Sequence, residues 1–283
     1  MWRIEHEHNE VSARRDDQVL GRAQLVPGNA ARSVELLVDH AAVGNAEVDE
    51  LRVVLLRVAL ELVAGEGGDT VHWWSPGAPD SDASVAAAAG MTAGRRLLQM
   101  QRPLPTGLPV DVETHAFRPG VDEEVWLAVN NRAFASHPEQ GGWTLDTLHG
   151  RLAEPWFDAA GFRLHEREGR LAAFCWTKLH TADDTPATSP HTGAVGEIYV
   201  IGVDPDFQGL GLGRQLTLAG LQSISERGID TGMLFVDAAY VAAVTLYERL
   251  GFAISRTDVA YTVDVAPSAR LDDHADRDGR PTN

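Results

Sequence analysis

A glycine-rich loop between a predicted strand and a predicted helix is the clearest chemical signal in this sequence. The run Gln208-Gly209-Leu210-Gly211-Leu212-Gly213-Arg214 follows a strand predicted over 197–203 and leads into a helix predicted over 211–227. Because glycine has no side chain, the backbone of such a loop can approach a phosphate, and the unpaired N–H groups of the first helical turn point at it. The helix dipole adds about half a positive charge. The pattern therefore predicts a site for the pyrophosphate of a cofactor.

The glycine spacing does not by itself identify the ligand. A Rossmann site would show an acidic residue after the second strand, and a P-loop would show Gly-Lys-Ser/Thr, and this segment has neither. A helix that begins loosely at a glycine, without any ligand, explains the loop equally well. A second element adds context. Residues 241–250 are predicted to form a helix with Tyr247 and Leu250 on one side, and Gly251 ends it.

The order of these elements resembles the GNAT acetyltransferases: strand, Gln-x-x-Gly-x-Gly helix, strand, then a helix reading Ala-x-x-x-Tyr-x-x-x-Gly-Phe. Three further segments make the resemblance specific to the mycothiol synthase family, whose members carry two GNAT domains in tandem. These segments are His137-Pro138-Glu139-Gln140-Gly141-Gly142-Trp143, Trp176-Thr177-Lys178 and residues 196–205. The resemblance is close over 112–265 and only architectural over 1–102.

The resemblance implies transfer of an acetyl group from acetyl-CoA to the cysteinyl amine of desacetylmycothiol (Cys-GlcN-Ins), the last step of mycothiol biosynthesis. It places Glu197 as general base and Tyr247 as the acid that protonates the departing CoA thiolate. An amine of this kind has a pKa near 8, so it arrives largely as ammonium and must lose a proton before it attacks. Read without the resemblance, Glu197 is an exposed edge-strand carboxylate and Tyr247 a core aromatic residue.

The resemblance also implies which residues hold the two substrates. Glu139 and Lys178, with Glu197 and Tyr247, are expected to bind the sugar–inositol acceptor, although solvated surface charges explain Glu139 and Lys178 equally well. The residues expected to bind acetyl-CoA lie at the strand end, in the glycine loop and beyond the last helix: Ile201, Gly202, Val203, Gln208, Gly209, Leu210, Gly211, Leu212, Gly213, Arg214, Phe252, Ala253, Ile254, Ser255, Arg256 and Thr257. No metal is expected, because the histidines show no ligand spacing beyond His6-x-His8.

Two departures from the family bear on ligand binding. The family usually has Asn seven residues before the tyrosine, where this chain has Tyr240, so its affinity for CoA is in question. In the first half, the strand predicted over 33–38 is followed by residues 39–46, which lack a glycine loop. We therefore expect a degenerate first domain, shortened at its start and without a cofactor of its own.

The predicted elements indicate an α/β protein, with a mixed sheet of the α+β kind in two tandem GNAT domains. Both halves run strand, helix, strand, helix, strand, which suggests a duplication. The first half has predicted strands over 33–38, 70–74 and 95–102 and helices over 48–63 and 81–89. The second has a strand over 112–117, a helix over 122–134, a hairpin over 162–178 and, after the loop helix, strands over 232–236 and 256–263. The expected domains are 1–102, a Pro-rich linker 103–111, a catalytic domain 112–265 and a disordered tail 266–283.

Composition limits the partners. The formal net charge of −17 disfavours nucleic acid and anionic membranes, and no run of about 20 apolar residues predicts a membrane span. The single cysteine, Cys175, fits a reducing compartment, so a cytoplasmic location is expected. We also expect a monomer whose partners are two small molecules, the acceptor and acetyl-CoA. Two other functions stay open: a GNAT enzyme for another amine, such as an aminoglycoside or a peptide N-terminus, and a non-catalytic acyl-CoA sensor.

Overall fold

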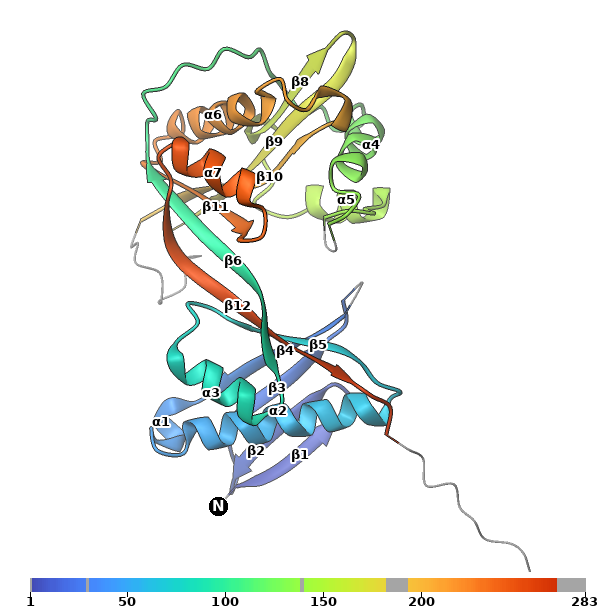
Figure 1. The fold of residues 1–283 in the computed structure, drawn as a ribbon, viewed down its shortest axis with the longest axis vertical. Coiled ribbons are helices and arrows are strands. Elements are labelled where there is room, and N and C mark those ends of the chain that lie inside the picture. Colours follow the sequence, from blue (N-terminus) through green and yellow to red (C-terminus); the bar gives the residue numbers. More distant parts are fainter. Residues whose placement is uncertain (1, 29–30, 138–139, 182–192, 269–283) are drawn as a thin grey trace, which may run out of the picture. The chain divides into compact units, whose positions relative to one another are not determined.

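The computed structural model describes residues 2–28, 31–137, 140–181 and 193–268. The contacts within the chain divide it into two compact units (Figure 1). Unit 1 takes its residues from 1–74, 80–93 and 261–283, and unit 2 from 75–79 and 94–260. Within the described ranges, no helix combines the length and the apolar character that a membrane span requires.

Unit 1 is a sheet with helices packed against it. Its strands are β1 (Arg3–Glu7), β2 (Glu10–Arg15), β3 (Gln18–Val26), β4 (Arg32–Val38) and β5 (Asp69–Ser75), and its helices are α1 (His40–Val43), α2 (Val48–Gly65) and α3 (Asp80–Ala88). Strands β1 to β4 pair antiparallel in sequence order, and β4 pairs parallel with β5. Helix α2 covers this sheet and buries Leu51, Leu55 and Leu56 completely, because these residues recur with helical spacing on one face.

Unit 2 is a mixed sheet in the order β12-β6-β11-β10-β9-β8-β7, in which β10 and β11 run parallel. Its strands are β6 (Thr92–Pro103), β7 (His115–Ala116), β8 (Phe162–Arg167), β9 (Arg170–His180), β10 (Val195–Val203), β11 (Thr231–Asp237) and β12 (Ala253–Val265). Its helices are α4 (Glu123–Ala133), α5 (Leu145–Leu152), α6 (Leu212–Ser225) and α7 (Val241–Arg249). A 3-10 turn, η3 (Pro205–Phe207), joins β10 to the glycine loop.

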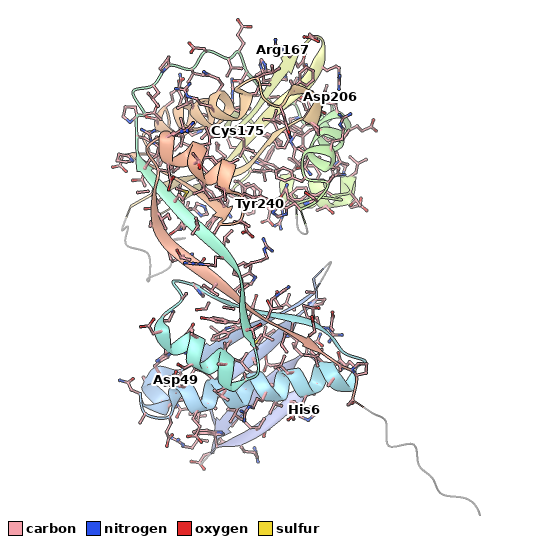
Figure 2. All side chains as sticks on the ribbon, viewed as in Figure 1. His6, Asp49, Arg167, Cys175, Asp206 and Tyr240 are labelled. Atoms are coloured by element: carbon pink, nitrogen blue, oxygen red, sulfur yellow. The ribbon has the colours of Figure 1, made fainter. Side chains whose placement is uncertain are left out.

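The sheet of unit 2 separates two hydrophobic cores. Cys175 packs with residues of α6 and α7, whereas its neighbour Trp176 packs with Trp126 of α4 and Phe162 of β8. Consecutive strand residues point to opposite faces, so α6 and α7 cover one face and α4 and α5 the other. Figure 2 marks Cys175 inside the α6 side, where burial raises the pKa of its thiol to about 12.

The predicted order of strands and helices is confirmed in both halves, with four differences, of which one is the unpredicted short helix α1. The opening strands β1 to β3 were not predicted; in β3 the available signal is the alternation of the buried Gly21, Ala23 and Leu25 with the polar Arg22 and Gln24. Helix α5 was missed as well, although Thr144 caps it by accepting the N–H of Thr147 at 3.2 Å. The strand expected over 112–117 is shorter, because only residues 115–116 pair with β8.

Each unit completes its sheet with a strand from the other half of the sequence. Residues 97–103 of β6 pair with β11 in unit 2. Residues 261–265 of β12 belong to unit 1, where the Thr262 hydroxyl lies 2.8 Å from His72 Nδ1 and Thr70 donates to Asp264 at 2.7 Å. The compact units are therefore divided differently from the sequence segments 1–102 and 112–265. Most of the segment 266–283 lies outside the described residues.

Candidate active site

The glycine loop presents bare backbone at the start of α6. Gly209 and Gly211 have φ of 78° and 77°, a left-handed conformation that suits glycine. A Cβ built on either residue would meet no atom within 4 Å, so both face open space. The first helical hydrogen bond runs from Gln215 N–H to the Gly211 carbonyl at 3.2 Å, which leaves the earlier N–H groups outside the helical ladder. The first turn of α6 contains no acidic residue. This backbone fits a pyrophosphate.

Ion pairs fix the turn that precedes the loop. The buried Asp204 accepts the N–H of Asp206 at 2.9 Å and so begins η3. Arg132 reaches both carboxylates, at 3.2 Å and 3.0 Å, and Arg170 bonds Asp206 at 2.8 Å. The hydrogen bond from Arg170 holds the pKa of Asp206, labelled in Figure 2, below its ordinary value. The acidic charges next to the loop are thus paired with arginine.

Strands β10 and β11 pair over only a short stretch. Their register joins Gly196, Glu197 and Ile198 to Gly232, Met233 and Leu234, and it goes no further, although β10 continues to Val203 and β11 to Asp237. On its other side β10 stays paired with β9 as far as Val203, with a register shift between Ile198 and Val200. The edge of β10 that faces β11 therefore carries backbone groups that a ligand can bond. The predicted residues Ile201, Gly202 and Val203 lie on this edge.

The two predicted catalytic residues lie on opposite faces of the sheet. Glu197 stands opposite Lys178 in the β9–β10 register, on the α4–α5 face, and only 8% of it is exposed. Tyr247 of α7 lies on the α6 side, in the hydrophobic core that also contains Ile198 and Leu216. After Ile198 the strands β10 and β11 no longer pair, so the sheet has an opening there between its two faces. Burial, with a contribution from Cys175, raises the pKa of Tyr247, so this phenol keeps its proton.

A histidine that sequence reasoning missed binds the candidate base. His180 Nε2 lies 2.6 Å from Glu197 Oε2, and both side chains are largely buried. Strand alternation could have identified His180, because it follows Lys178 by two residues in the same strand and so lies on the same face of the sheet. Lys178 lies on the same face with its Nζ 4.8 Å from the centre of the Trp156 ring. Glu139, the other expected acceptor ligand, lies outside the described residues.

The segment expected to bind the cofactor beyond α7 is held by contacts within unit 2. Phe252 packs edge-on against Tyr247, with 5.8 Å between the ring centres. Ser255 donates to the Gln99 carbonyl at 3.1 Å. Arg256 makes two hydrogen bonds to Asp258, at 2.8 Å and 3.0 Å, so its guanidinium is already paired.

Tyr240, which replaces the usual family Asn, begins α7 and is 44% exposed. Its ring stacks on His137 with 6.2 Å between the centres, and Figure 2 labels Tyr240. Where the family usually has an amide, this chain therefore has an aromatic contact with His137.

Unit 1 lacks the loop geometry of unit 2. Its helix α2 begins at Val48 with Glu47 at the N-cap, and Asp49 and Glu50 occupy the first turn. Figure 2 marks Asp49 at this helix start. Three carboxylates at a helix N-terminus repel the phosphate that α6 would attract. Within the described residues, no cluster of His, Cys, Asp and Glu has metal-binding geometry.

Comparison with known proteins agrees with this geometry. A sequence model of the Acetyltransferase (GNAT) family matches residues 126–252. The chain is 46% identical over 250 residues to a mycothiol acetyltransferase from Thermobispora bispora, covering 87% of this chain and 80% of that protein. It is 50% identical over 254 residues to the one from Thermomonospora curvata, covering 87% and 79%.

Solved structures show the same fold at low sequence identity. A GCN5-related N-acetyltransferase from Sphaerobacter thermophilus gives a TM-score of 0.69 at 19% identity, covering 93% of this chain and 82% of that one. A tandem GNAT protein from the clavulanic acid biosynthesis pathway gives 0.63 at 18% identity, covering 92% and 83%. With relatives this similar over most of both sequences, the chain belongs to the mycothiol acetyltransferase family of GNAT proteins.

Proposed function

We propose that this chain transfers the acetyl group of acetyl-CoA to the cysteinyl amine of desacetylmycothiol. The observation that carries the proposal is the opening between β10 and β11, which has Glu197 on one face and Tyr247 on the other. A thioester placed in that opening is accessible to a base from the α4–α5 side and to an acid from the α6 side. The family relationship supplies the chemical class, acetyl-CoA and a small-molecule amine.

The proposed binding of acetyl-CoA uses backbone groups more than charge. The pyrophosphate bonds the loop from Gln208 to Arg214, whose first-turn N–H groups and helix dipole attract an anion even in an acidic protein. The pantetheine arm pairs with the free edge of β10 at Ile201–Val203, like an added strand. Phe252 to Thr257 line the site beyond α7. This mode of binding suits the net charge of −17, because it needs few lysines.

In the proposed reaction, Glu197 removes a proton from the ammonium of the acceptor. The free amine then attacks the thioester carbonyl, and the C–N bond forms as the C–S bond breaks. The electron pair of the C–S bond leaves on the CoA sulfur, which takes the proton of the Tyr247 hydroxyl. The raised pKa of Tyr247 keeps that proton available at neutral pH. A thiolate protonated in this way is a better leaving group.

The acceptor is proposed to enter from the α4–α5 face. Lys178 and Glu197 are neighbours there, and Trp156 and Tyr199 form an aromatic pair beside them with 5.0 Å between ring centres. A sugar–inositol acceptor offers hydroxyls to the two charged groups and C–H faces to the rings. Glu139 is proposed as a further ligand.

Glu197→Gln tests the proposal. The variant should keep its fold and its affinity for acetyl-CoA and lose about 10²–10⁴ in turnover, the usual contribution of a positioned base. Raising the pH should restore part of the loss, because the amine then deprotonates in solution. The assay measures CoA release with desacetylmycothiol beside aminoglycosides and peptide amines. A Glu197→Gln variant as active as wild type at pH 7 would remove Glu197 from the mechanism.

The amine panel separates this function from the other two. Faster turnover with an aminoglycoside or a peptide would identify a different acceptor. Tight acetyl-CoA binding without CoA release on any amine would identify an acyl-CoA sensor.

A further inference from the structure

The hydrogen bond between His180 and Glu197 has no place in the reaction as written above. Glu197 is 8% exposed and sits in the middle of the sheet, whereas His180 ends β9. The 2.6 Å between Nε2 and Oε2 is short, as expected when one partner is charged. Among the hydrogen bonds of the described residues, this is the one that the Glu197 carboxylate makes. It joins the base to the end of β9.

From this contact we infer that His180 is a positioning residue for the general base, an inference that rests on the proposed role of Glu197. A glutamate side chain has three rotatable bonds, and a base must lie within hydrogen-bond reach of its proton. A donor from Nε2 occupies Oε2 and fixes the carboxylate plane. Oε1 is then the oxygen that receives the proton of the ammonium.

His180 is one of several titratable groups near the Glu197 carboxylate. The other titratable groups near the pair are Lys178 opposite Glu197 on β9 and Tyr199 on β10, whose pKa burial raises. Arg151 and Glu154 from the end of α5 act on Tyr199 with opposite signs. Of these groups, His180 is the one bonded to the Glu197 carboxylate.

The experiment compares His180→Ala, His180→Gln and the control His165→Ala. His165 is another strand histidine, with its Nδ1 2.8 Å from the Glu113 carbonyl, and has no role in the proposed site. His180→Ala should lower kcat about 10- to 100-fold and leave the KM for acetyl-CoA unchanged. His180→Gln, which retains an N–H donor, should recover most of the rate. His165→Ala should behave as wild type.

A double variant separates this inference from the proposed function. If His180 acts through Glu197, adding His180→Ala to Glu197→Gln lowers kcat by less than twofold further, because the base is already lost. Independent, multiplicative losses in the double variant would overturn the inference, as would a His180→Ala variant with wild-type kcat. Both results leave the role of Glu197 intact as long as Glu197→Gln alone is impaired. Wild-type activity of Glu197→Gln would instead refute the proposed role of Glu197 as the base.

Discussion

Replacing Gly211 with valine tests whether the loop before α6 binds acetyl-CoA. Gly211 is the N-cap of α6 with φ 77° and ψ 5°, and its missing Cβ points into space that no protein atom occupies within 4 Å. The fold therefore suffers no steric clash from the new side chain. The valine must, however, adopt the left-handed conformation of Gly211. This conformation destabilises the fold by about 1–2 kcal/mol for an L-residue and by somewhat more for a β-branched one.

The expected loss of binding is larger than the loss of stability. The valine would occupy the space where phosphate oxygens meet the N–H groups of the first turn. Loss of two hydrogen bonds to a charged group, each worth about 1.5–3 kcal/mol, weakens binding by about 10²–10⁴-fold. A domain with about 5–15 kcal/mol of stability survives the strain.

Gly228 supplies a matched control. It lies just beyond the other end of α6 with φ 80° and also faces open space, so Gly228→Val carries the same backbone strain away from the loop. Titration calorimetry with acetyl-CoA and thermal unfolding should show similar losses of Tm for the two variants, but weakened binding only for Gly211→Val. The reasoning fails if Gly211→Val stays folded and binds acetyl-CoA as tightly as wild type, or if Gly228→Val loses as much affinity.

Two further predictions concern stoichiometry and pH. Calorimetry should give one acetyl-CoA per chain, because α2 opens with Glu47, Asp49 and Glu50 where α6 opens with glycine; two equivalent sites would contradict this. Asp122→Asn should destabilise the protein by about 1–3 kcal/mol at pH 7, since Asp122 is buried and accepts a hydrogen bond from the Arg118 guanidinium at 2.6 Å. The Arg118 hydrogen bond lowers the pKa of Asp122, so this stability is present above the unfolded value near 3.9 and is lost as pH falls through the lower folded pKa. Denaturant melts of both proteins from pH 7 to pH 3 should therefore converge at the acid end, and a constant gap would refute the assignment.

The sequence by itself determined the local parts of this protein. The glycine loop, the helix after it and the Tyr247 helix were predictable, because helix starts, caps and apolar stripes depend on residues within one or two turns. The hairpin over 162–178 was equally local, with Glu168 and Gly169 at positive φ in its turn. The strands β1 to β3 were missed because their apolar residues alternate weakly, so pairing with neighbouring strands is what stabilises them.

Only the tertiary structure decided how these parts meet. The separation of β10 from β11 after Ile198 depends on a register between segments more than 30 residues apart, which no local pattern encodes. The pairing of β9 with β10 brings His180 to 2.6 Å from Glu197, and the packing of α7 against the other face of the sheet places Tyr247 opposite Glu197. The repeated order of elements in the two halves also does not predict that β6 pairs in unit 2 or that the end of β12 belongs to unit 1. Strand pairing depends on hydrogen bonds that any backbone can make, so the choice of partner is settled by the packing of the whole chain.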